Sequence, residues 1–204
     1  MKALLRKDLY ILTTTLSRIA IVYLIFPVVA LINPKISFFL FYVGLLAGTL
    51  SSTMISYDNN FGWTTYAETL PISRRTVVGE RYLFSLILVL VSTLIGAICY
   101  LSYILRGKPE YASFPMLLQM VSLSMIMPSV LLPFSLRYGT EKARYIVMFL
   151  VIGITMVSQS FFTPGEGELT IPADFSPVMF AATSVLFIGS YFLSVKWYQD
   201  KESV

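Results

Sequence analysis

Histidine is absent from this chain of 204 residues, and Cys99 is its only cysteine. Without histidine, the chain lacks the commonest general base and the commonest metal ligand. A single cysteine excludes a disulfide within the chain, and its place inside an apolar run favours a small buried residue over a reactive thiol. These absences count strongly against an intramembrane enzyme that would need His and Glu ligands within its spans.

Charged residues are also scarce. They make up 13% of the chain, whereas 56% is hydrophobic and the mean hydropathy is +0.76. A soluble domain carries about a quarter charged residues, so this composition indicates a membrane protein. The net charge of +4 does not indicate a nucleic-acid partner, because a membrane protein needs basic residues for its orientation. We see no internal repeat and expect a single transmembrane domain over residues 1–204.

The motifs of phosphate binding and hydrolysis are missing as well. The chain contains no G-x-x-x-x-G-K-[ST] loop, no H-E-x-x-H and no G-x-S-x-G. Its acidic residues lie in loops and at the ends of apolar segments, whereas a proton-driven pump would carry acids within its spans. We therefore expect neither an enzyme nor a self-contained pump, with no cofactor or metal bound to this chain.

Six apolar segments are long enough to cross a membrane, which takes about 20 apolar residues. The first lacks a clear cleavage site, so we expect a retained span rather than a signal peptide. None carries a charge in its middle, and the predicted fold is an all-α integral membrane protein. The segments cover residues 17–32, 37–55, 82–105, 115–136, 145–162 and 177–195.

The basic residues predict how the chain is oriented. With the N-terminus in the cytoplasm, only Lys35, Arg106 and Lys108 lie outside, and 12 of the 15 basic residues lie inside. This is the distribution that the positive-inside rule favours. Both termini are then cytoplasmic, and Trp63 and Trp197 lie near the inner interface, where indoles are favoured.

Residues 1–16 form a separate unit. Leucines at positions 4, 5, 9, 12 and 16 recur at helical spacing, with Lys2, Arg6, Lys7 and Asp8 between them. This pattern favours an amphipathic helix lying in the inner membrane interface. The alternative is a ragged extension of the first span.

The long inner segment, residues 57–81, interrupts the apolar chain with the polar sequence ETLPISRR. A T-x-x-E spacing that begins at Thr65 has the form of a capping box and predicts a short helix up to about Leu70. Pro71 prevents its continuation, and Ser73 can cap a new helix that starts at Arg74 and runs into the third span. A short helix between two spans can transmit force from a docked cytoplasmic subunit. The alternative is a loop whose arginines only set the topology.

This segment resembles the permease subunits of ABC type-2 transporters, through its aromatic-rich loop and the pattern T-L-P-[IV]-S-R at residues 69–74. The motif likeness covers residues 57–83. The length, the interfacial helix, the six spans and the helix between spans two and three resemble the family over the whole chain. Within the family, the chain looks most like the short permeases of bacterial peptide exporters, including the phenol-soluble modulin exporter.

The resemblance implies a cytoplasmic coupling helix that docks on a separate ABC ATPase, which binds ATP and Mg. Two ATPase subunits would serve two permease chains, identical or different, in a bacterial cell membrane. The implied ATPase contacts are Thr64, Thr65, Tyr66, Glu68, Thr69, Leu70, Pro71, Arg74 and Arg75, with Glu68 as a charge partner. A supporting contact would come from Arg137, Glu141, Lys142 and Arg144.

Small and weakly polar residues remain inside the spans. Gly44, Gly48 and Ser52 share one helix face, where G-x-x-x-G permits close approach of another helix. This face suits either packing within one chain or a dimer contact. Side chains on the fourth and fifth spans either line a path for an amphipathic cargo or serve packing alone. They are Gln119, Ser122, Thr155 and Gln159.

The function predicted is the permease subunit of an ATP-driven exporter that moves a hydrophobic or amphipathic cargo outward, a peptide before a lipid or drug. One alternative is the substrate-capturing membrane component of an energy-coupling-factor vitamin uptake system. That class should present a polar pocket toward the outside, and the sequence offers no strong outer cluster. A membrane assembly protein without transport activity is the other alternative.

Overall fold

The computed structural model describes residues 2–14, 21, 25, 27–29, 31–32, 38–69, 73–107, 114–146, 148–149 and 176–200. Within these residues every regular element is a helix, as expected for an all-α protein. Residues 140–146 are helical as well. The principal helices are α1 (Lys2–Thr14), α3 (Phe38–Asn60), α4 (Trp63–Thr69), α5 (Arg74–Leu105), α6 (Phe114–Tyr138) and α8 (Ser176–Gln199).

Three of these helices are long and apolar enough to cross a membrane. They are α5, the part of α6 from Leu117–Tyr138, and α8. They coincide with the third, fourth and sixth predicted spans, and α3 is helical over most of the second. Most of the first predicted span and most of the fifth lie outside the described residues, so the count of six spans stays a prediction.

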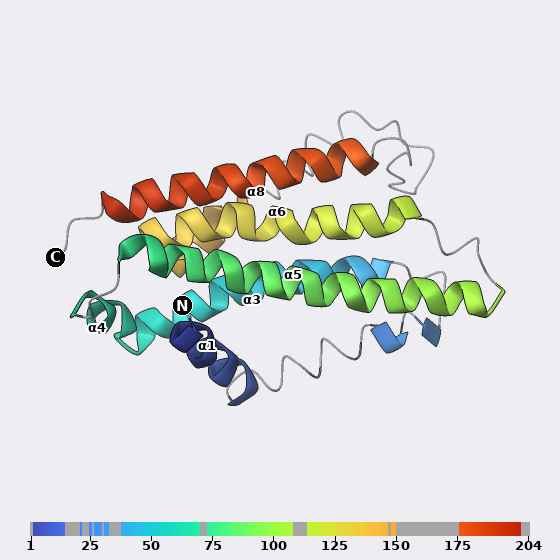
Figure 1. The fold of residues 1–204 in the computed structure, drawn as a ribbon, viewed down its shortest axis with the longest axis horizontal. Helices are drawn as coiled ribbons and strands as arrows, with labels where there is room; N and C mark the ends of the chain where they lie inside the picture. Colours follow the sequence, from blue (N-terminus) through green and yellow to red (C-terminus); the bar gives the residue numbers. More distant parts are fainter. Residues whose placement is uncertain are drawn as a thin grey trace.

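The four long helices run alongside one another, while α1 and α4 lie together at one end of the bundle (Figure 1). α6 packs against both α3 and α8, and α5 contacts α3, α6 and α8. A buried apolar cluster near the α4 end is formed by side chains of α3, α5 and α6. Side chains of α8 pack against this cluster, so it joins all four long helices. Its buried members are Ile55, Val78, Tyr82, Leu132 and Leu136.

The chain breaks on either side of α4 for local reasons. Gly62 has φ 67°, a left-handed conformation that glycine adopts without penalty, and it separates α3 from α4. The carbonyl oxygen of Gly62 accepts a bond from the Tyr66 amide at 3.2 Å. α4 therefore begins at Trp63, and the prediction that Thr65 starts the helix as its N-cap is wrong.

The start of α5 agrees with the sequence. Ser73 is its N-cap, and the Ser73 side chain accepts a hydrogen bond from the Thr76 amide at 3.3 Å. The helix then runs without a break from Arg74 to Leu105. One rigid element therefore connects the polar inner segment to the apolar span, as the capping pattern predicts.

A chain of hydroxyl groups joins three helices inside the bundle. The Tyr82 hydroxyl of α5 lies 2.6 Å from the Ser190 hydroxyl and 2.7 Å from the Ser194 hydroxyl of α8. Ser190 in turn donates to the carbonyl oxygen of Ser129 in α6 at 2.6 Å. Because these groups are buried among apolar residues, their bonds hold α5, α6 and α8 in one register.

Candidate functional site

The end of the bundle that carries α4 also carries the start of α5, the end of α8 and the turn after α6. The Arg74 guanidinium donates to the carbonyl oxygen of Gln199 at 3.0 Å, which joins α5 to α8 there. Gly139, in the turn after α6, lines the same small cavity as Trp63 and Ala67 of α4. The two segments with predicted ATPase contacts therefore lie at the same end of the molecule.

The cavity beneath α4 is small. Residues of α3, α4, α5, α6 and α8 line it, and its volume is about 40 Å³. That space accommodates water molecules rather than a transported molecule. Its polar lining includes Asp58, Asn59 and Arg81. The cavity is therefore a small space where five helices meet, and it is too small to hold a cargo.

The predicted contact residues of α4 and α5 fall into three groups. Tyr66, Thr69 and Arg75 are exposed. Arg74 is half-buried and bonded to the end of α8, so it has a role within the chain. The remaining members lie outside the described side chains: Thr64, Thr65 and Glu68 within α4, and Leu70 and Pro71 after it.

The predicted supporting contact also presents exposed charge. Arg137, at the end of α6, lies over the ring of Trp197 at 4.6 Å and over that of Tyr138 at 5.3 Å. These cation–π contacts orient the guanidinium along the molecular surface. The side chains of Glu141, Lys142 and Arg144 are exposed in the helical stretch that follows.

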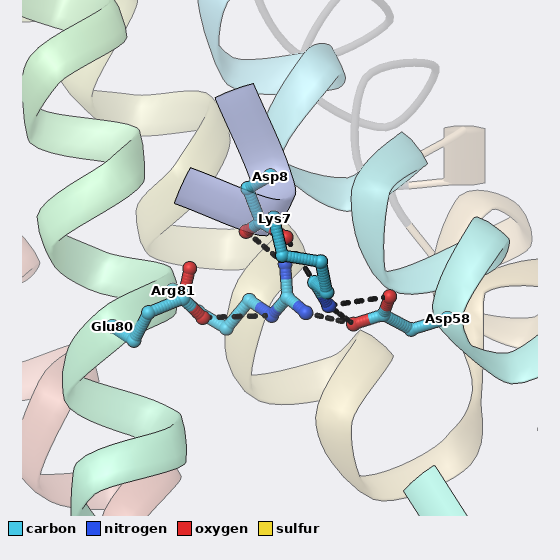
Figure 2. A network of polar contacts seen from close by, with 5 residues as sticks. All are labelled: Lys7, Asp8, Asp58, Glu80 and Arg81. Atoms are coloured by element: carbon cyan, nitrogen blue, oxygen red, sulfur yellow. Dashed lines mark hydrogen bonds and ion pairs between the residues drawn. The ribbon is translucent and has the colours of Figure 1, made fainter. Parts of the chain in front are cut away.

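A network of ion pairs joins α1, α3 and α5 (Figure 2) and contacts α4 through Trp63. Arg81 of α5 reaches two other helices: its Nη1 donates to Asp8 of α1 at 2.6 Å, and its Nη2 donates to Asp58 of α3. Its Nε lies 3.4 Å from the Glu80 carboxylate. A planar guanidinium suits such bridging, because its donors form a rigid fork.

Lys7 of α1 completes the network. Its Nζ lies 2.8 Å from Asp58 and 3.2 Å from Asp8, and 4.3 Å from the centre of the Trp63 ring in α4. Burial, followed by the positive charge of Arg81, lowers the pKa of Lys7, while Asp8 acts in the opposite direction. We call Lys7, Asp8, Asp58, Glu80 and Arg81 the ion network from here on.

The ion network holds three carboxyl groups and two cations. Asp8 and Glu80 are almost fully buried, with 0% and 1% of their surface exposed. Within the described residues, Asp8 Oδ1 has only the ion pair with Lys7 at 3.2 Å, and Glu80 Oε1 has no hydrogen-bond partner. Since a buried ion pair is expensive to desolvate, the network contributes a defined geometry more than net stability.

Sequence reasoning missed this network. It treated Arg81 as a topology signal, Asp58 as the polar end of a span, and Lys7 and Asp8 as the water-facing side of an interfacial helix. The structure corrects the last point, because Asp8 points into the protein and is fully buried. The sequence did contain a signal. Asp8 interrupts the leucine-rich N-terminal helix, and Asp58 and Arg81 lie near the ends of two apolar helices.

The candidate packing and cargo residues are placed only in part. Ser52 is buried in α3, while the surroundings of Gly44 and Gly48 lie outside what the structure describes. Ser122 is buried and bonds the Leu118 carbonyl of its own helix at 2.7 Å. Gln119 is half-buried on α6, and Thr155 and Gln159 lie outside the described residues. The cargo path therefore stays a prediction.

Comparison with known proteins gives the family. A family model described as ABC-2 family transporter protein matches residues 3–199, from α1 to the last residue of α8. Searches of curated proteins and of solved structures gave no match. Because the family model covers nearly the whole chain, including every principal helix described above, this protein belongs to the ABC-2 family of transporter proteins.

Proposed function

We propose that this chain is the permease half of an ATP-driven exporter, with α4 as the coupling helix that docks on a separate ATPase. Family membership supports the coarser part: an ABC-2 protein is the membrane component of an ABC transporter, and the family implies an ABC ATPase partner. The finer part is our proposal. Two permease chains and two ATPase subunits form the transporter, and α4 faces the bacterial cytoplasm.

One observation carries the assignment of α4. This short helix and the turn after α6 lie at one end of the bundle, around the same cavity. There α4 presents an exposed Tyr66, and the start of α5 presents an exposed Arg75. A docked subunit could therefore contact both segments at once, as expected of a partner that drives the whole bundle.

The proposed cargo is a hydrophobic or amphipathic peptide. The described apolar helices carry hydroxyl groups rather than charges in their middle portions, which suits such a cargo. In vesicles that contain both subunits, we expect an amphipathic helical peptide to stimulate ATP hydrolysis. High-affinity capture of a vitamin by the permease alone would instead favour the uptake-system alternative.

The proposal is tested by recovering the chain from its native membrane in mild detergent and identifying what accompanies it. We expect an ABC ATPase to co-purify with the wild type and to be lost from Tyr66→Ala combined with Arg75→Glu. Arg106→Glu is the matched control, because it reverses a charge at the opposite end of α5. Recovery of the wild-type chain alone, from cells that contain the ATPase, would overturn the proposal.

A further inference from the structure

We propose that the ion network and Trp63 together form the joint through which movement of α4 reaches α1, α3 and α5. In this joint Lys7 and Arg81 are positioning residues. The inference rests on the proposed function of α4. It goes further by naming the side chains that transmit the movement of α4.

The contacts form a continuous connection. The Trp63 ring of α4 lies 4.3 Å from Nζ of Lys7, and this Nζ lies 2.8 Å from the Asp58 carboxylate of α3. Arg81 then ties α5 to α3 through Asp58 and to α1 through Asp8. Three helices that are separate in the sequence thus meet at a single cluster of charges (Figure 2), and Trp63 connects the fourth, α4, to it.

Among the described side chains of α4, one is buried beside this connection. Ala67 is buried on α4, whereas 56% of the surface of Tyr66 is exposed. Trp63, at the first turn of α4, is only partly exposed, and it also lines the cavity that Asp58 and Arg81 border. Any displacement of α4 toward or away from the bundle therefore moves the ring that covers Lys7.

The chemistry of the cluster explains why it would move as a unit. Separating a buried cation from its carboxylate leaves an uncompensated charge away from water, which is strongly unfavourable. An apolar contact between helices can slide at lower cost, because dispersion forces have no fixed direction. The guanidinium of Arg81 is bonded to two helices at once, so neither can shift without the other.

The test uses variants that leave every charge of the network in place. Trp63→Leu removes the aromatic ring over Lys7, and Trp63→Phe retains an aromatic face. In reconstituted complexes we measure transport per ATP hydrolysed. We expect Trp63→Leu to lower this ratio about tenfold, a usual magnitude for coupling between two sites. Trp63→Phe should keep most of it, and both variants should still bind the ATPase.

Lys7→Met provides an independent arm, with Arg6→Met as its matched control. Both substitutions remove one positive charge from neighbouring positions of α1, but Arg6 is exposed. Lys7→Met should uncouple transport, and Lys7→Met with Trp63→Leu should be no worse than the stronger single variant, because both break the same link. Normal coupling in Trp63→Leu, or an equal loss in Arg6→Met, would overturn the joint.

A second measurement separates this inference from the proposed function. Spin labels at Tyr66→Cys on α4 and Leu105→Cys at the far end of α5 report their distance distribution without any ATPase, since the native Cys99 is buried. We expect a narrow distribution that broadens in Trp63→Leu and in Lys7→Met. If no ATPase binds but this broadening appears, the proposed function fails and the joint stands. An unchanged distribution refutes the joint.

Discussion

The hydroxyl of Ser190 donates a hydrogen bond of 2.6 Å to the carbonyl oxygen of Ser129. In a regular helix this carbonyl accepts from the amide four residues later, but in α6 that residue is Pro133, which has no N–H. A serine of α8 therefore supplies the donor that α6 lacks. Prolines are tolerated in spanning helices where a neighbouring helix satisfies the freed backbone group.

This relationship predicts a specific cost for Ser190→Ala. Its loss leaves the Ser129 carbonyl buried without its donor, which typically costs about 1–3 kcal/mol. Thermal unfolding in detergent should show the loss. Thr183→Val is the control on the same helix, because the Thr183 hydroxyl bonds the carbonyl of Phe180 within its own helix. Equal effects of the two substitutions would contradict the bridging role.

The three carboxyl groups of the ion network are not equivalent, which predicts opposite outcomes for two isosteric substitutions. Asp58→Asn weakens the acceptor shared by Lys7 and Arg81, and breaking a buried pair typically costs about 3–5 kcal/mol. Glu80→Gln replaces a buried carboxyl group, which lies 3.4 Å from Arg81, with an amide of nearly the same shape. We expect it to be neutral or stabilising. Denaturant titration in detergent compares the two.

The bridging geometry of Arg81 predicts that charge alone does not replace it. Arg81→Lys keeps the positive charge, but a single ammonium group does not reproduce the fork that reaches Asp8 and Asp58 from separate nitrogens. We expect α1 to detach from the bundle, so that trypsin cleaves at Arg6 faster in this variant than in the wild type. Cleavage at the wild-type rate would show that one charge is sufficient.

The cap of α5 predicts that Ser73→Ala lowers the free energy of unfolding by less than the breaking of a buried ion pair does. Ser73→Ala removes the side chain that accepts from the Thr76 amide, and loss of an N-cap costs about 1 kcal/mol. Ser102→Ala, near the other end of α5, is the comparison, because its hydroxyl bonds the carbonyl of Cys99 in its own helix. Unfolding measurements should separate them, and a larger loss for Ser102→Ala would argue against the cap.

The charge distribution predicts which end of the bundle faces the cytoplasm. Introduced cysteines at Tyr66 and at Arg106 mark opposite ends, and both positions are exposed. An impermeant maleimide should label Arg106→Cys in intact cells, and Tyr66→Cys only after permeabilisation. The native Cys99 is buried, which keeps the background low. The reverse labelling pattern would invert the predicted orientation.

The sequence by itself determined the class of protein and the course of the main chain around its polar segment. Scarce charge and long apolar runs predicted the helices α5, α6 and α8, because a segment must satisfy its backbone internally to lie in a membrane. Ser73 and Arg74 predicted the start of α5, since capping depends on residues within one turn. The resemblance carried by residues 69–74 agrees with the family to which the chain belongs.

Only the tertiary structure decided which polar residues act together. Asp8 and Arg81 are 73 positions apart, and no local rule connects them. The same holds for Ser190 and Ser129, which meet only because α8 packs against α6. The physical reason is that desolvation and hydrogen bonding depend on what surrounds a side chain in space. Arg81, which the sequence presents as an orientation signal, is thus the centre of the ion network once the helices assemble.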